Sequence, residues 1–243
     1  MTTHHTRPLA FTGPAVQASV VRHAKNYLIG PEAIVINPTP TPVPLAHTPA
    51  KAIEPLTSTV LTHTRIEHAD TLLVLRPATG LDAHPTDAIT RETGWQHLTD
   101  RLTDQGNPNA FPATTPLFTS PQDTAATIHL DPAHLLKETP TPTDIRPFDL
   151  KVNLWYAPAG TDCLIHNSHD FIEVHTQIQG LGRMQKFTAD DPATRYEDIR
   201  MAPGYTTPDP FCSTRPDGTY HYPWHQYYAD TDALWLALEF HAR

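Results

Sequence analysis

Proline is the residue that most limits what this chain can fold into. The 243 residues include 26 prolines and only 10 glycines. Proline lacks a backbone N–H, so it interrupts both helix interiors and central strands. We therefore expect many short segments and a mainly β protein. The stretch 37–44 (NPTPTPVP) in particular cannot be a central strand.

Short apolar runs mark the expected strands of the N-terminal part. They lie at 33–36, 57–62 and 71–75, and their length and composition are typical of strands. The chain is expected to divide into three parts. These are a loose tail at 1–15, a β-rich N-terminal region with one helix at 16–147, and a β-barrel with a candidate site at 148–243.

One segment, 87–105, predicts a helix. Ile89, Leu98 and Leu102 form an apolar stripe along it, and Gly106 is placed to end it. The prolines that follow, through residue 147, predict an extended connector with short strands.

Charge and composition narrow the expected partners to small molecules. The formal charge is −9, and no basic run exists that could neutralise a series of phosphates, so neither nucleic acid nor an anionic membrane is expected. No apolar run approaches the roughly 20 residues of a membrane helix, and no signal peptide is evident, which favours a cytoplasmic protein. Cys163 and Cys212 are then expected to be free thiols. A homodimer is left open.

Histidines and a glutamate gather within ten residues of the C-terminal part. His166, His169, Glu173 and His175 occur in a stretch of alternating polar and apolar residues, which is typical of a strand. From His169 onward the odd-numbered side chains share one face. Inside a barrel such groups would be costly to bury unless they bound a metal or one another.

The spacing of this stretch resembles the first motif of the cupin superfamily. Five residues separate Gly160 from His166, three separate His169 from Glu173, and six separate Glu173 from Gly180. The one departure is the gap of two residues, rather than one, between the two histidines.

That gap leaves two alternatives open. A bulge or turn at 167–168 would turn both His166 and His169 toward the same ion, and bulges are common beside active sites. Otherwise His166 lies outside and His175 takes its place.

A second resemblance to cupins lies nearer the C-terminus. Pro203 and Gly204 resemble the turn that precedes the second motif, residues 205–222 would be an enlarged loop, and His225 would be the histidine of the closing strand. Together the two motifs imply a cupin jelly-roll barrel.

The resemblance also implies a metal centre and a set of site residues. The implied cofactor is one divalent ion, either Fe(II), Zn, Mn, Ni or Cu, because mixed nitrogen and oxygen ligands suit all of them. The expected metal ligands are His166, His169, Glu173 and His225; the expected catalytic residues are Glu173, His175 and Tyr227; and the expected substrate-binding residues are Arg183, Gln185 and Trp155.

A faint internal similarity links residues 69–75 with residues 229–236. If it reflects two related halves, the N-terminal region is a degenerate second cupin that lacks the histidine spacing. Otherwise that region is an extension covering the barrel.

The function implied is a metal-dependent enzyme of specialised metabolism acting on a small molecule, as a dioxygenase or as an isomerase or lyase. One alternative is a rearrangement enzyme that forms a nitrogen–nitrogen bond in an amino-acid-derived intermediate. Another is a cupin that binds a small ligand without catalysis. Glycine-rich phosphate loops and nucleophile-elbow motifs do not occur in the sequence.

Overall fold

The computed structural model describes residues 4–78, 89, 92–106, 111–136, 144–207, 212–215 and 217–243, and within them the protein is mainly β, as expected. In the N-terminal part the strands are β1 (His5–Pro8), β2 (Val16–Ile29), β3 (Ala33–Asn37), β4 (Val43–Leu45), β5 (Lys51–Ile53), β6 (Thr57–Leu61) and β7 (Thr64–Pro77).

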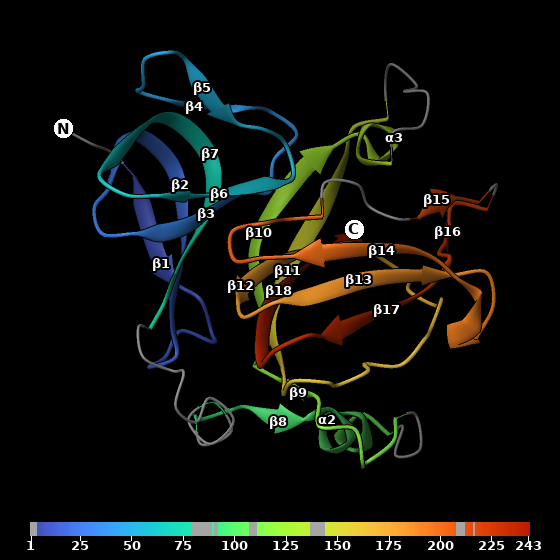
Figure 1. Ribbon diagram of the computed structural model, residues 1–243. Helices are drawn as coiled ribbons and strands as arrows, with labels where there is room; N and C mark the ends of the chain where they lie inside the picture. The colour runs from blue at the N-terminus through green and yellow to red at the C-terminus, as the bar shows by residue number, and fades with distance from the viewer. Residues whose placement is uncertain are drawn as a thin grey trace.

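The remaining elements follow in chain order (Figure 1): β8 (Gln96–His97), α2 (Leu98–Asp104), β9 (Phe118–Thr119), β10 (Asp123–Leu130), α3 (Pro132–Leu135), β11 (Arg146–Ala157), β12 (Ile172–Gln179), β13 (Gly182–Phe187), the 3-10 turn η2 (Pro192–Thr194), β14 (Arg195–Met201), β15 (Ser213–Thr214), β16 (Tyr220–His221), β17 (Trp224–Ala229) and β18 (Ala233–Ala242).

A long antiparallel hairpin organises the N-terminal part. Strands β2 and β7 pair from Val16 opposite Pro77 to Ile29 opposite Thr64. In the described residues, five strands run in the order β1-β2-β7-β3-β6, and β4 and β5 complete the sheet. The expected strands at 33–36, 57–62 and 71–75 correspond to β3, β6 and β7.

Two sheets face each other in the C-terminal part. The larger has the described strand order β12-β18-β11-β9-β8, with β10 also paired to β11, and the smaller has the order β14-β13-β17. Strand β13 pairs with β17 along its whole length. The rings of Tyr227, from the smaller sheet, and Trp235, from the larger, stack at 3.8 Å, so the two sheets enclose the interior of a jelly-roll barrel.

The larger sheet is buried on both faces, and this places the N-terminal sheet against it. Every residue of β12 except the last is buried. Its even-numbered apolar side chains belong to one continuous core with alternate residues of the N-terminal strands. This shared core includes Val20, Ile36, Leu73, Leu75, Ile172, Val174, Leu236 and Leu238.

The opposite face of the N-terminal sheet has its own core. Val21, Val35, Leu72 and Val74 point away from the barrel into a second cluster of buried residues. The period of two in a strand therefore divides each of β2, β3 and β7 between two cores.

Within the segment 1–15, the described residues 4–15 are not the loose tail that we expected. Strand β1 pairs with β2, Leu9 and Phe11 are buried in the shared core, and Arg7 forms an ion pair with Asp123 at 2.7 Å. The burial of two large apolar side chains ties this segment to the barrel.

The expected helix at 87–105 is shorter in the structure. Helix α2 begins at Leu98, after a two-residue strand at Gln96–His97 that pairs with β9. The His97 side chain caps the helix by accepting a hydrogen bond from the Thr99 N–H. Residues 87, 88, 90 and 91 of the expected helix lie outside the described residues.

The segment after α2, which we expected to be an extended connector with short strands, contributes an eight-residue strand to the barrel. Strand β10 pairs with β11 from Asp123 opposite Val152 to Leu130 opposite Arg146, so it is a member of the barrel sheet. Of the two similar stretches, residues 69–75 lie within β7, whereas residues 229–236 run from the end of β17 into β18.

We predict that Leu73→Ala destabilises the whole protein. Leu73 is fully buried where the N-terminal sheet meets the barrel, so the cavity left by its removal should lower the free energy of unfolding by about 2–5 kcal/mol. Urea denaturation followed by circular dichroism measures the change. The matched control is Leu28→Ala, because Leu28 is 48% exposed and its truncation should change stability by less than about 0.5 kcal/mol. Equal effects of the two variants would contradict the shared core.

Candidate metal centre

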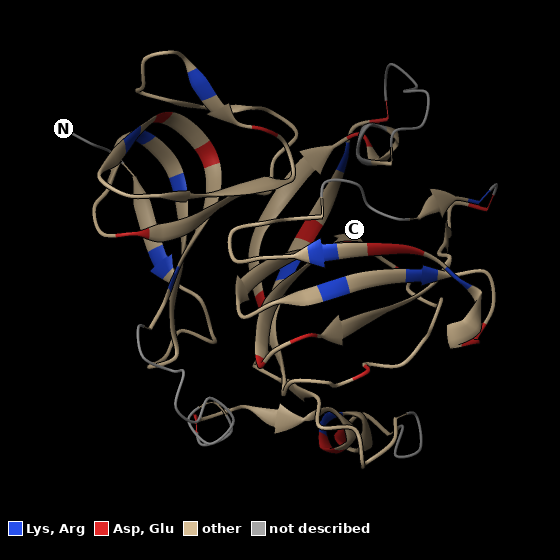
Figure 2. Ribbon diagram, viewed as in Figure 1, with Lys and Arg blue, Asp and Glu red and all other residues tan. Residues whose placement is uncertain are grey.

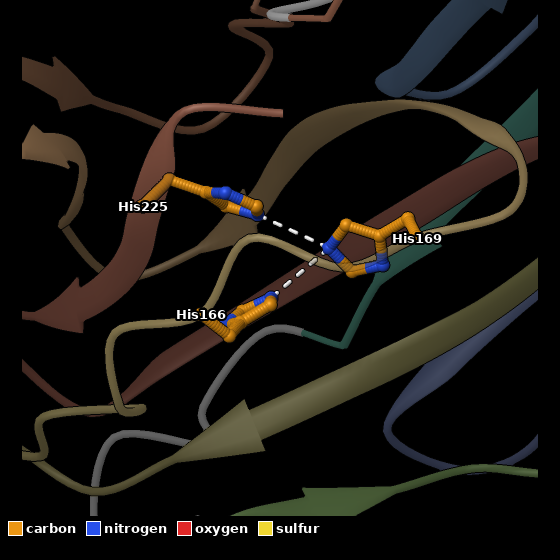
Figure 3. A group of neighbouring side chains, drawn as sticks. All are labelled: His166, His169 and His225. Carbon is orange, nitrogen blue, oxygen red and sulfur yellow. Dashed lines mark hydrogen bonds between the residues drawn. The ribbon is translucent and has the colours of Figure 1, made fainter. Parts of the chain in front are cut away.

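Three imidazole rings converge at one end of the barrel (Figure 3). The Nε2 atom of His169 lies 3.0 Å from Nε2 of His166 and 3.1 Å from Nε2 of His225. One nitrogen from each ring lies within 4.8 Å of the others. The sequence-predicted histidines at 166, 169 and 225 are therefore brought together by the fold.

A backbone pairing between two distant segments positions two of the rings. The N–H of His166 donates to the carbonyl of His225 and the N–H of His225 donates to the carbonyl of His166, both at 2.9 Å. The two residues form an isolated antiparallel bridge. The loop that carries the first histidines is thus joined to β17.

Backbone carbonyls fix how these two rings are protonated. Nδ1 of His166 lies 3.0 Å from the Leu164 carbonyl oxygen, and Nδ1 of His225 lies 2.9 Å from that of Pro223. A carbonyl oxygen can only accept, so each Nδ1 carries the proton and each neutral ring presents the lone pair of Nε2 to the cluster. Such outer contacts are typical of histidines that bind metals.

The donor set fits a divalent ion. Nitrogens 3.0–3.1 Å apart have the separation of two ligands at a right angle, each about 2.1 Å from one ion. Converging lone pairs repel one another unless a proton or a cation lies between them. His166, His169 and His225 are thus suited to hold a metal on one side and to leave its other side open.

Glu173 lies beside the three histidines, and its carboxylate forms a hydrogen bond with the side chain of His175. Its Oε1 is 3.0 Å from Nε2 of His175, and its Oε2 is 3.9 Å from Nε2 of His169. Both residues project from β12 into the barrel. Burial by itself would raise the pKa of Glu173, but the charge and hydrogen bond of His175, together with His169, outweigh it and lower the pKa to about 2.

Lowered pKa values favour, at His225 and His169, the neutral form that metal binding requires. Burial, followed by the proximity of His166, lowers the pKa of His225 to about 2. Burial also lowers the pKa of His169, against the opposing effect of Glu173. A neutral imidazole is the form that ligates a metal.

Tyr222 is a positioning residue that the sequence reasoning missed. Its hydroxyl donates to the Phe171 carbonyl at 2.6 Å and accepts from the Glu173 N–H at 3.0 Å. Its ring lies 4.8 Å from that of His169 and 5.5 Å from that of His225. The only signal in the sequence was its place three residues before His225.

The structure favours one of the two alternatives for the unusual histidine gap. Residues 166–169 lie before the start of β12 and outside any regular strand, so the strand rule that would turn positions three apart to opposite faces does not apply. His166 and His169 both point to the cluster (Figure 3), whereas His175 is directed to Glu173.

A cavity of about 450 Å³ opens next to the three histidines. Of the other residues that we predicted for the site, Glu173, His175, Trp155 and Tyr227 line it. The Tyr227 hydroxyl donates to Oε1 of Gln177 at 2.6 Å, and burial raises its pKa.

Arg183 and Gln185 do not line this cavity, contrary to our prediction. Both lie on β13 on the face opposite to Met184, which does line it. Arg183 instead pairs with Asp230 at 2.8 Å and with Asp198 at 3.1 Å on the outside of the barrel, where Figure 2 shows the basic residues of β13 beside the acidic ones of β14. Alternation along the strand turns these side chains outward.

Cys163 and Cys212 are both buried and are not joined by a disulfide, as expected. Cys163 lines the cavity, and its burial raises the pKa of the thiol, so the thiolate form that would react or bind a metal is disfavoured.

Comparisons with known proteins identify resemblance to cupins among solved structures. An RmlC-like cupin from Desulfovibrio desulfuricans shares 17% identity, with 37% of this chain and 71% of that chain covered and a TM-score of 0.26. A protein of unknown function from Pseudomonas syringae shares 11%, with 96% and 86% covered and a TM-score of 0.33. A variant of Bacillus subtilis oxalate decarboxylase shares 12%, with 100% and 76% covered and a TM-score of 0.28.

No protein-family model matches the chain, and no curated protein sequence matches it either. The facing sheets define the C-terminal part as a jelly-roll β-barrel, as the sequence predicted, and the three-histidine cluster at its end is a candidate metal centre. Within the described residues no helix has the length and apolar composition needed to span a membrane.

We predict that the metal-free protein loses stability as the pH falls below about 6.5, the ordinary pKa of histidine. In that range the unfolded chain binds a proton at residue 225 and the folded chain, with the pKa of His225 lowered to about 2, does not. The free energy of unfolding should therefore fall with falling pH, by up to about 1.4 kcal/mol per pH unit for this group.

Urea denaturation with a chelator present, between about pH 7.5 and pH 5, measures this dependence. The variant His225→Gln should show a shallower slope than the unaltered protein, whereas His221→Gln, at an exposed histidine, should retain the slope. Identical slopes for the unaltered protein and His225→Gln would count against the burial of a neutral imidazole at this position.

Proposed function

We propose that this chain is a metal-dependent enzyme of the cupin type that acts on a small molecule. Its cofactor is one divalent ion held by His166, His169 and His225, with Glu173 as the fourth protein ligand. The reaction is that of a dioxygenase or of an isomerase or lyase.

The convergence of three Nε2 atoms at the edge of a cavity is the observation that supports this proposal. Two of the rings are oriented by backbone carbonyls, and the cavity gives a substrate access to the side of the ion that protein does not cover. A site with three or four protein ligands and an open side is typical of catalysis rather than of structural support.

A divalent ion at this position would supply Lewis-acid chemistry or, if redox-active, electron-transfer chemistry to a bound substrate. The residues of the chain have separate tasks. The three imidazoles would hold the ion, Glu173 would offset part of its charge, and His175, whose Nε2 lies 3.0 Å from Oε1 of Glu173, would orient that carboxylate at the cavity wall. Trp155 and Tyr227 form part of the wall that excludes water.

Purified protein should contain close to one divalent ion per chain by elemental analysis. His169→Ala and His225→Ala should each weaken the binding of Zn(II) or Fe(II) by at least about 100-fold, because each removes a nitrogen donor from a set of three. Calorimetric titration of the metal-free protein with Zn(II) measures the affinity. His221→Ala is the control, because His221 lies four residues from His225 and is exposed. Full metal binding by both ligand variants would refute the site.

Replacement of Glu173 tests whether it binds the ion or only pairs with His175. If it is a ligand, Glu173→Gln should weaken the binding of Co(II) by about tenfold or more and change the visible absorption of the bound ion. His175→Gln should leave that absorption nearly unchanged, because His175 contacts the carboxylate and not the cluster. A spectrum that responds to His175→Gln and not to Glu173→Gln would reverse this assignment.

Oxygen consumption separates the two reaction classes. A dioxygenase loaded with Fe(II) consumes dioxygen in proportion to the substrate converted, whereas an isomerase or lyase works equally well without it. The Zn(II) form provides the matched control, since Zn(II) has no redox chemistry and should support only the second class.

A further inference from the structure

The cavity beside the three histidines is polar at one end and apolar elsewhere. Its volume of about 450 Å³ falls within the range of about 300–1,000 Å³ that is typical of small-molecule sites. The polar end is formed by the histidines, Glu173 and Ser168. The apolar walls include Leu98, Leu102, Trp155, Tyr227 and Trp235.

Three aromatic rings form one wall of this cavity. Tyr227 and Trp235 stack at 3.8 Å with 14° between their planes, and Trp235 and Trp155 lie 6.4 Å apart with 13° between theirs. Trp155 and Trp235 are direct cross-strand neighbours on β11 and β18. Trp155, at the end of this series, is only partly buried, so one more planar ring could pack against the wall.

Helix α2 contributes apolar side chains to the cavity and keeps its basic residue out of it. Leu98 and Leu102 line the cavity, one helical turn apart. Arg101 instead donates from Nη1 to Oγ1 of Thr119 at 2.9 Å and to the Ser120 carbonyl at 3.2 Å.

The charge inside the cavity is small and is confined to the metal end. Among the lining residues that the structure describes, Glu173 is the single carboxylate, and none is lysine or arginine. With a divalent ion bound, the net charge at that end is about +1. One anionic oxygen of a ligand balances this charge, and a second anionic group would have no cation to pair with.

We infer that the substrate class of this site is a small molecule with a planar aromatic ring and a single anionic oxygen donor, such as a carboxylate, enolate or phenolate. The donor reaches the ion, and the ring packs against Trp155 between the aromatic wall and the leucines of α2. This inference rests on the proposed metal site. Dicarboxylates, phosphates and nucleotides do not match the cavity, because their additional charges would enter an apolar space.

Binding of three simple carboxylates tests the inference. The probes are 2-naphthoate, acetate and oxalate, titrated by calorimetry into the Zn(II)-loaded protein and into the metal-free protein. In the Zn(II) form, 2-naphthoate should bind at least about tenfold more tightly than acetate or oxalate, because only its ring buries apolar surface and stacks. The metal-free form should bind 2-naphthoate more weakly but retain its preference over acetate.

Variants at the aromatic wall provide a second test of the inference. Trp155→Ala should weaken the binding of 2-naphthoate about tenfold and leave Zn(II) affinity unchanged, and Trp155→Phe should retain most of the binding because it keeps a ring and the fold. Tyr196→Ala is the control, since Tyr196 is 57% exposed and does not line the cavity. Equal affinity for oxalate and 2-naphthoate, or unchanged binding in Trp155→Ala, would overturn the inference.

The two proposals can fail separately. Stoichiometric Zn(II) binding without a preference for 2-naphthoate would refute the substrate class and leave the metal site standing. A Trp155-dependent preference for 2-naphthoate in a protein that does not bind Zn(II) would uphold the aromatic cavity and refute the metal centre.

Discussion

The backbone bridge between His166 and His225 is the interaction on which the rest of the site depends. Two hydrogen bonds of 2.9 Å join residues that are far apart in the chain, and they bring the loop before β12 and the strand β17 close enough for their imidazoles to meet. His169 then completes the cluster from the same loop. This pairing satisfies the N–H and carbonyl groups of both residues. Their rings can therefore be directed to a ligand while the main chain remains hydrogen-bonded.

Burial of the larger barrel sheet on both faces links the site to the N-terminal half. A sheet whose outer face carries Val174, Leu236 and Leu238 cannot be left in water, and the N-terminal sheet covers this face through Leu73 and Leu75. The inner face is consequently free to carry polar groups. The N-terminal sheet thus contributes to the site through stability, since the described residues that line the cavity all come from position 98 onward.

Much of the fold could be predicted because short-range patterns specify it. Proline spacing and apolar runs predicted β3, β6 and β7, and alternation predicted β12 with Glu173 and His175 on one face. Long-range packing could not be predicted in the same way. The segment 1–15 looked loose because its two anchoring side chains, Leu9 and Phe11, are too few to form a pattern, and α2 begins later than its apolar stripe because Gln96–His97 pairs with β9.

The sequence by itself determined which residue types the candidate site contains, because residue types and their spacing are local properties: the spacing of His166, His169, Glu173 and His225 resembles the cupin motifs. Only the tertiary structure decided which side chains share a cavity. It directed His175 to Glu173, turned Arg183 and Gln185 outward, and placed Leu98 and Trp155 beside the histidines. These outcomes depend on where strands begin and on which sheets face each other, and contacts between residues distant in the chain set both.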